Sequence, residues 1–362
     1  MKRCFALLCA FAALVCAGCP KTKPPIQTLG IEANRSGFIL NTVCNVTLFN
    51  AGSEVFSSVF HHLVEIENHL SLYQQDSDIS HVNDSAGIAP VEVNDDTFKV
   101  VERALHFAEI SGGAFDPTVG PLISLWDIGR HSRILSQWED NIEQLSQLQT
   151  AHPIPSQAQI EAVLPLINWK NVDLDRDRRT IFLRQPGMAL DLGALGKGYA
   201  ADEAVKAARE AGVKHALVNL GGDLLISGER PDGTDWRVGV REPSQGSGVN
   251  MGILNVGECA IATSGVYERY FTDGETLYHH LLSPFDGYPV QNGLVSVTVI
   301  TGNAMDADAL STVVFVLGYE KGRALVESLG GTEAVFIFSD RNIRKTSGAN
   351  FDLVNEAYTL VD

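Results

Sequence analysis

The chain has 362 residues, 45% of them hydrophobic, and a formal net charge of -17 at pH 7. So acidic a protein is not expected to bind nucleic acid, because that would require a basic surface. It would need a cation to hold a polyanionic ligand, which favours a metal site. Its length allows one large domain, or two closely joined lobes, after an export segment.

The first 29 residues predict export and a lipid anchor. A charged start is followed by an apolar run over residues 4–17, which is typical of a signal peptide and too short to span a membrane. The run ends at Cys16-Ala17-Gly18-Cys19, which resembles the lipobox of bacterial lipoproteins. We therefore expect a signal peptide over residues 1–18, lipidation of Cys19, and a tether over residues 19–29. The protein would face the periplasm from the inner membrane; the alternative is a secreted protein.

The remaining chain, residues 30–362, predicts an α+β fold. Four of the six cysteines lie in or beside the leader, so Cys44 and Cys259 form no disulfide scaffold. Helices and antiparallel-looking strands alternate without a βαβ rhythm. In chain order we expect a strand at 38–49, helices at 55–70 and 98–110, a polar surface excursion at 130–155, a helix at 156–166, a hairpin of 172–175 with 180–183, a helix at 196–211, strands at 216–220, 236–240, 252–255 and 296–300, and a helix from Asp306.

Two glycine-rich segments indicate close approach of the backbone to a ligand. Residues 111–121 follow a helix, and there Phe115 offers an aromatic face and Asp116 an acceptor. Residues 191–202 open a helix with glycines and Lys197, an arrangement that suits phosphate but matches neither a Walker A nor a Rossmann sequence. An ordinary helix-ending loop and a structural helix start are the alternatives.

Further polar groups stand at predicted strand ends. Residues 218–223 place paired glycines before Asp223, which leaves room for a flat or phosphorylated group. Thr263 and Ser264 precede a glycine and suit phosphate oxygens or a turn. One histidine of the pair His279-His280 could act as acid or base, unless both are satisfied polar residues of a strand. Tyr73 is either a residue at the edge of the core or a stacking platform.

The segment 305–312, Met-Asp-Ala-Asp-Ala-Leu-Ser-Thr, carries oxygen ligands for a hard cation such as Mg2+. Asp308 and Thr312 are four residues apart, so on a helix both side chains can bind one ion. The alternative is an ordinary first helical turn. By contrast, the side chains His61, His62, Glu65 and His69 match no zinc pattern, and we interpret them as a solvated helix face.

Five motifs in this order resemble the ApbE family of FAD:protein FMN transferases, which includes the flavin-trafficking lipoproteins of spirochaetes. The motifs are Ser-x-Gly-Ala-Phe-Asp-Pro-Thr-Val-Gly-Pro-Leu, Asp-Leu-Gly-Ala-x-x-Lys-Gly-Tyr-Ala-x-Asp, Asn-Leu-Gly-Gly-Asp, Thr-Ser-Gly-x-Tyr-Glu-Arg and Ala-Asp-Ala-Leu-Ser-Thr. One departure is Leu40-Asn41-Thr42, where the family usually has Met-Gly-Thr.

The resemblance implies an ApbE-like, T-fold-like α+β domain with mixed, largely antiparallel sheets and a cleft that binds FAD, with Mg2+ on its pyrophosphate. The carbonyl of Ala194, with Asp308 and Thr312, would bind the metal, and His280 would be the catalytic acid or base. The residues expected to contact FAD are Leu40, Tyr73, Ala114, Phe115, Asp116, Asp191, Lys197, Asp223 and Thr263.

The implied reaction is displacement of AMP from FAD by a hydroxyl. A threonine of an acceptor protein, such as a subunit of a redox complex, would receive FMN through a phosphoester. Attack by water would instead give FMN and AMP, so FAD hydrolysis is an alternative. A third hypothesis, of another class, is a lipoprotein that binds and stores flavin without turnover.

Overall fold

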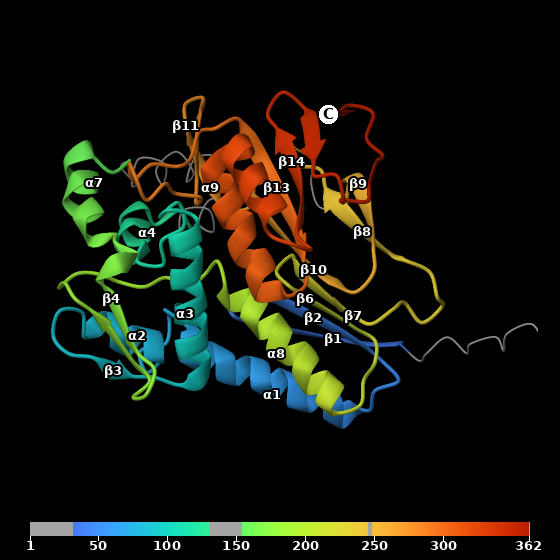
Figure 1. The fold of residues 1–362 in the computed structure, drawn as a ribbon, viewed down its shortest axis with the longest axis horizontal. Helices are drawn as coiled ribbons and strands as arrows, with labels where there is room; N and C mark the ends of the chain where they lie inside the picture. Colours follow the sequence, from blue (N-terminus) through green and yellow to red (C-terminus); the bar gives the residue numbers. More distant parts are fainter. Residues whose placement is uncertain (1–31, 130–153, 245–247, 362) are drawn as a thin grey trace, which may run out of the picture.

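The computed structural model describes residues 32–129, 154–244 and 248–361 (Figure 1). Its centre is a nine-stranded sheet in the order β1-β2-β6-β7-β10-β13-β14-β15-β17, antiparallel throughout except for the pair β15 and β17. The predicted α+β class with largely antiparallel strands is therefore confirmed. The strands of this sheet are β1 (Glu32–Ile39), β2 (Thr42–Phe49), β6 (Ala216–Leu220), β7 (Asp223–Ser227), β10 (Cys259–Gly265), β13 (Leu294–Thr301), β14 (Glu333–Phe338), β15 (Asn342–Lys345) and β17 (Thr359–Leu360).

Both faces of this sheet are covered. Three helices, α1 (Ser53–Leu70), α8 (Gly196–Glu210) and α9 (Ala304–Ser328), lie in front of it in Figure 1. A three-stranded sheet of β16 (Phe351–Leu353), β9 (Asn250–Val256) and β8 (Trp236–Arg241) packs on the other face. Side chains alternate between the two cores along a strand: Phe336 packs with the helices and Val335 with the small sheet.

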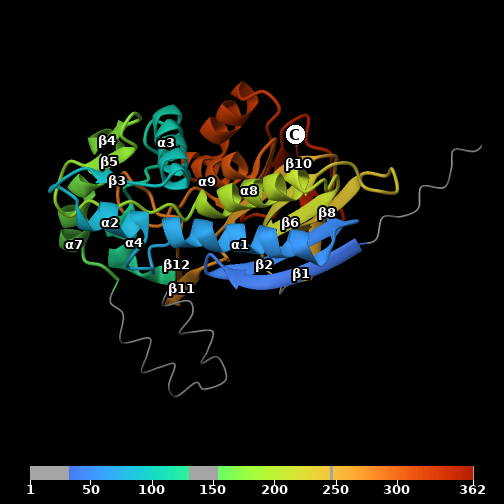
Figure 2. The same ribbon diagram turned by 90° about the horizontal axis from the view of Figure 1, so that it is seen from below.

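A smaller region beside the helices completes the described fold, at the left of Figures 1 and 2. Its own core surrounds Trp126, whose indole N–H donates to the Gly287 carbonyl at 2.7 Å. The elements of this region and its surroundings are α2 (Asp78–Asp84), β3 (Val91–Glu92), α3 (Asp95–Ile110), α4 (Gly120–Trp126), α7 (Gln157–Val163), the 3-10 turns Leu164–Leu166 and Trp169–Asn171, β4 (Val172–Asp175), β5 (Thr180–Leu183), β11 (Tyr270–Asp273) and β12 (Thr276–His279).

Most predicted elements are present, and one was wrong. The stretch 38–49 is not one strand, because the chain reverses at Leu40 and Asn41 to form the β1–β2 hairpin. Both residues have left-handed backbone angles, φ 54° and 57°. Two such residues give a tight hairpin turn, but leucine rarely adopts this conformation, so Leu40 is not a recognisable turn residue. Ser156 caps α7, and its side chain and that of Gln159 form a capping box.

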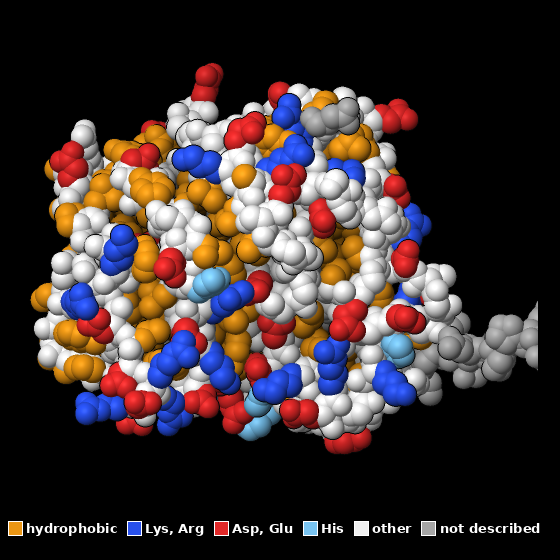
Figure 3. Space-filling model, in the orientation of Figure 1, with side chains coloured by type: hydrophobic (Ala, Val, Ile, Leu, Met, Phe, Trp, Pro, Cys, Tyr) orange, Lys and Arg blue, Asp and Glu red, His pale blue; other side chains and the backbone are white. Residues whose placement is uncertain are grey.

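Several predictions lie outside the described residues: the signal peptide, the tether, the lipidated Cys19, and nearly all of the surface excursion at 130–155. Within the described ranges, no helix combines the length and the apolar character that a membrane span requires. On the face seen in Figure 3, Lys and Arg side chains are interspersed with Asp and Glu.

Helices α8 and α9 cross in close contact at Gly198. A Cβ added there would overlap the carbonyl oxygen of Ala304 and crowd the Cα of Met305. Only glycine allows the two backbones to approach this closely. This contact sets the distance between the Lys197 segment and the start of α9.

We predict that Gly198→Ala lowers the free energy of unfolding by about 2 kcal/mol, because the added methyl group must push α8 and α9 apart. Gly257→Ala is the control, since a Cβ there meets no atom within 4 Å; we expect it to change stability by less than about 0.5 kcal/mol. Urea denaturation of both variants measures the difference. Equal stabilities would show that the helices can separate freely.

Candidate functional site

One cavity of about 1050 Å³ brings the predicted site together. Its walls come from the β1–β2 turn, the end of α1, the loop before α4, the start of α8, the β6–β7 turn, β10 and the first turns of α9. Every residue proposed above for catalysis, FAD contact or metal binding lines this main cavity: Leu40, Tyr73, Ala114, Phe115, Asp116, Asp191, Ala194, Lys197, Asp223, Thr263, His280, Asp308 and Thr312. Their individual roles remain predictions.

Lys197, in the first turn of α8, links this helix to β7 and α9 in the wall of the main cavity. Its ammonium lies 2.7 Å from Asp223 Oδ2 and 3.1 Å from both carboxylate oxygens of Asp308. Burial opposes the charge of Lys197, but the two carboxylates outweigh it and raise its pKa. Burial, followed by the charge of Asp308, raises the pKa of Asp223 to about 7 despite the opposing effect of Lys197. Two carboxylates thus share one ammonium.

The proposed metal ligands are all oxygen donors. Asp308 and Thr312 lie one turn apart on α9, and Ala194 lies just before α8. This donor set suits Mg2+, and the shared ammonium leaves negative charge for a cation to balance. Thr312 Oγ1 also lies 3.2 Å from Ser264 Oγ, so β10 contributes to its placement. The residues therefore fit a bound Mg2+.

Two tight hairpin turns enter the main cavity. In the β1–β2 turn, Asn41 has a left-handed backbone, which asparagine tolerates. The Leu40 N–H donates to Glu67 Oε1 at 2.8 Å. In the β6–β7 turn, Gly221 and Gly222 have φ of 65° and 106°. This turn brings Asp223 to the start of β7, facing Lys197.

The loop before α4 is held by Asp116. Its Oδ1 accepts from the backbone N–H and the hydroxyl of Thr118, at 2.9 and 2.6 Å. Its Oδ2 accepts from the Trp169 N–H at 2.9 Å, and burial raises its pKa. Asp116 therefore shapes the loop that presents Ala114 and Phe115. By contrast, Tyr73 is 74% exposed and forms part of the cavity wall, so its ring is free to stack on a ligand.

Asp191 and Thr263 complete the polar wall. Asp191 Oδ1 accepts from the Gly193 N–H at 2.8 Å, and burial raises the pKa of this carboxyl group. Thr263 lies opposite Thr298 on the neighbouring strand, with their hydroxyl oxygens 2.8 Å apart. Both pairs fix polar atoms of the wall in position.

His280 has one ring nitrogen engaged with the backbone. Its Nδ1 lies 3.2 Å from the carbonyl oxygen of Arg269, to which it donates. Burial, followed by the charge of Arg269, lowers the pKa of His280 to about 3. The ring is thus neutral near pH 7, and its Nε2 is left as a hydrogen-bond acceptor. Its neighbour His279 is buried and engages the Val290 carbonyl through Nε2, while its buried Nδ1 has no hydrogen-bond partner among the described residues.

Arg269 was not assigned a role from the sequence. It lines the main cavity, and its charge acts on both Asp191 and His280. It is the last residue of the motif Thr-Ser-Gly-x-Tyr-Glu-Arg. A basic residue at the end of a motif, in a chain this acidic, could have identified Arg269 as a candidate site residue. Trp126, Arg241 and Tyr267 line the same cavity and were likewise missed.

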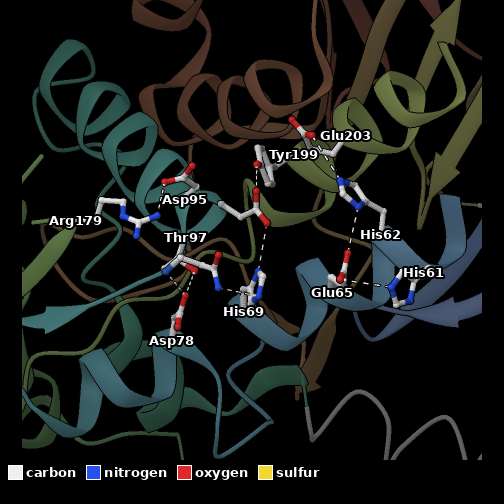
Figure 4. Close-up of polar contacts among 12 residues, drawn as sticks. His61, His62, Glu65, His69, Asp78, Asp95, Thr97, Arg179, Tyr199 and Glu203 are labelled. Atoms are coloured by element: carbon white, nitrogen blue, oxygen red, sulfur yellow. Dashed lines mark hydrogen bonds and ion pairs between the residues drawn. The ribbon is translucent and has the colours of Figure 1, made fainter. Parts of the chain in front are cut away.

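The histidines of α1 lie away from the main cavity lining (Figure 4). His61 and His62 pair with Glu65 at 3.5 and 3.3 Å on an exposed face, which confirms the predicted solvated surface. His69 is less exposed and meets Asp96, which also accepts from the Tyr199 hydroxyl. Across the described ranges, no three side chains of His, Cys, Asp and Glu form a metal-binding cluster.

Comparison with known proteins gives relatives over almost the whole chain. The model of the ApbE family matches residues 40–336. A FAD:protein FMN transferase of Treponema pallidum is 34% identical, with 88% of this chain and 87% of the relative covered. One of Klebsiella pneumoniae is 32% identical, with 90% and 96% covered.

Solved structures agree with the fold. The crystal structure of the ApbE protein from Thermotoga maritima has a TM-score of 0.74 and 30% identity, covering 88% of this chain and 97% of that one. Flavin transferase ApbE from Vibrio cholerae has a TM-score of 0.73 and 26% identity, covering 91% and 98%. The chain belongs to the ApbE family.

Proposed function

We propose that this enzyme is a Mg2+-dependent FAD:protein FMN transferase that attaches FMN to a threonine of an acceptor protein and releases AMP. The observation that carries the proposal is that residues from five separate motifs between positions 111 and 312 line one cavity, together with Leu40, Tyr73 and His280. Curated relatives named FAD:protein FMN transferase cover most of the chain.

The chain's own residues divide the work in this proposal. Lys197 would hold the pyrophosphate, while Asp308, Thr312 and the Ala194 carbonyl would hold Mg2+. When bound, Mg2+ would neutralise the pyrophosphate and polarise the phosphorus that is attacked. Tyr73 and Phe115 would supply aromatic surface to the isoalloxazine ring.

His280 would remove the proton from the attacking hydroxyl. Its Nδ1 donates to the Arg269 carbonyl, so its neutral Nε2 is an acceptor. The threonine oxygen then bonds to the FMN phosphorus, the bond to the AMP oxygen breaks, and the proton passes to Nε2. Attack by water would follow the same route and give free FMN, so access of the acceptor decides between transfer and hydrolysis.

The acceptor and the location follow from the same proposal. The acceptors would be exported proteins, such as subunits of redox complexes, that present a threonine to the main cavity. Lipidation at Cys19 would hold the enzyme on the periplasmic side of the inner membrane. The lipobox-like sequence before Cys19 supports this placement.

A flavin-storing lipoprotein is the second candidate, and the exposed ring of Tyr73 favours it. Tight stacking on this ring would retain FAD rather than pass it on. The two functions differ in the fate of FAD after Mg2+ is added. Cleavage to AMP supports transfer, and intact bound FAD without any acceptor-dependent turnover supports storage.

We predict that Asp308→Ala, or EDTA, lowers Mg2+-dependent AMP release from FAD by about 100-fold or more, because the metal loses its carboxylate. Glu320→Ala is the control, since Glu320 is an exposed acid of α9 beyond the kink at Gly318. AMP and FMN are followed by chromatography. Full turnover by Asp308→Ala in EDTA would refute the metal assignment.

We predict that the neutral state of His280 makes the fold sensitive to acid. Its folded pKa of about 3 lies below the ordinary 6.5, so this stability is present above pH 6.5 and is lost as the pH falls toward 3. Between pH 7 and pH 4, the native protein should lose about 2 kcal/mol more unfolding free energy than His280→Asn. Urea denaturation at both pH values measures this. Parallel losses would mean that His280 is solvated and titrates normally.

We predict that Tyr73→Ala weakens FAD binding about 10-fold in EDTA, whereas Tyr73→Phe keeps most of the affinity, because the ring and not the hydroxyl stacks on the flavin. Quenching of flavin fluorescence reports the dissociation constant. If both variants bind like the native protein, the exposed ring contributes nothing to flavin binding.

A further inference from the structure

A second cavity, of about 610 Å³, lies on the outer side of α8 and α9 and shares no lining residue with the main cavity. Charged side chains from α3, α8 and the start of α9 line it, among them Arg103, Asp202 and Asp306. Arg103 and Asp202 contact the first turn of α9. Asp308, on the other side of this helix, lines the main cavity.

Asp202 of α8 holds the first backbone N–H groups of α9. One carboxylate oxygen accepts from the Ala304 N–H at 2.8 Å and the other from the Met305 N–H at 2.9 Å. These donors have no partner within a helix, and a negative charge is favourable at this end of the helix dipole. A carboxylate from another helix therefore fixes where α9 begins.

Asp306 ties the same turn to α3. The Arg103 guanidinium donates to both oxygens of Asp306, at 2.7 and 2.6 Å, in a fork that also fixes orientation. Asn303 caps the helix by accepting from the Asp306 N–H at 2.9 Å. The first turn of α9 is thus held from two neighbouring helices.

Because α9 is a helix, the rotation of its first turn also sets the position of Asp308 in the main cavity. Asp306 and Asp308 are two residues apart, so their side chains leave α9 on nearly opposite sides, about 200° apart. Asp306 meets Arg103, while Asp308 meets Lys197 and accepts from the Gly198 N–H at 3.2 Å. A rotation of the first turn that moved Asp306 away from Arg103 would also move the Asp308 carboxylate on the opposite side of the helix.

We propose that Asp202 and the Arg103–Asp306 pair are positioning residues for the metal site: they set the rotation and the start of α9 so that Asp308 and Thr312 face the ion. The inference rests on the proposed function, in which these two residues bind Mg2+. Residues that orient metal ligands from behind commonly contribute 10- to 100-fold to metal affinity. Lysine would replace Arg103 only in part, because it keeps the charge but lacks the fork.

The test compares metal binding and turnover in Asp202→Asn, Arg103→Met and the milder Arg103→Lys. Arg209→Met is the matched control: Arg209 lines the same cavity and pairs with Glu258 at 2.7 Å and Ser227 at 2.9 Å, but it makes no contact with α9 among these bonds. Mn2+ alone is titrated by electron paramagnetic resonance, and FAD turnover is measured over a series of Mg2+ concentrations.

We expect the Mn2+ dissociation constant and the Mg2+ concentration for half-maximal turnover to rise about 10-fold in Asp202→Asn and Arg103→Met. Arg103→Lys should give a smaller rise, and KM for FAD at saturating Mg2+ should stay within about threefold of the native value, because these residues do not line the main cavity. Arg209→Met should leave both metal constants unchanged.

Unchanged metal constants in folded Asp202→Asn and Arg103→Lys, with stability alone reduced, would overturn the inference and leave the proposed function standing. A native protein that binds no Mn2+ and turns over FAD equally well in EDTA would overturn the metal assignment itself, and the inference with it. If Arg103→Met does not fold, Arg103→Lys decides, since it retains the charge and loses only the fork.

Discussion

The ion-paired Lys197 is the contact on which the arrangement of the main cavity depends. It joins the start of α8 to β7 through Asp223 and to α9 through Asp308. Two nearly buried carboxylates would repel each other without it, and an isolated buried charge costs far more than a paired one. The sheet, the start of α8 and the first turns of α9 are therefore held at a distance that one ammonium can bridge. Gly198, the next residue, allows α9 to approach closely enough for this to happen.

Acidic side chains are also found in the lining of the main cavity. Asp191, Asp223 and Asp308 all line the main cavity, and Lys197, Arg241 and Arg269 supply the positive charge there. Burial raises the pKa of Asp191 and Asp223, although the charge of Lys197 acts against this rise at both carboxyl groups. A divalent cation and a pyrophosphate would enter together as charges that nearly balance. The wall is suited to a metal–phosphate complex rather than to a free polyanion.

The sequence predicted the fold class and a set of residues that line one cavity, and the roles of those residues stay predictions. Motifs such as Asn-Leu-Gly-Gly-Asp carry their chemistry at the ends of elements, where glycine and aspartate are visible in the sequence, and their residues meet in one cavity. The β1–β2 hairpin was missed because Leu40 occupies a left-handed conformation that its type rarely adopts. Likewise, the sequence could not show that the Asp116 carboxylate accepts hydrogen bonds from both Thr118 and Trp169, since Trp169 lies 53 residues away. Such contacts depend on tertiary packing, which no local pattern records.

The two aspartates at the start of α9 show how one short segment can serve two environments. Asp308 faces the main cavity and Asp306 faces Arg103, although their sequence context is nearly the same. Helical periodicity alone predicts that they diverge, but only the structure shows which one meets a lysine and which an arginine. The outer aspartate has its charge fully used in a fork, so it orients the helix. The inner one shares a single ammonium with Asp223, so it retains capacity for a cation. Function is thus divided between the two by the partners that the fold supplies.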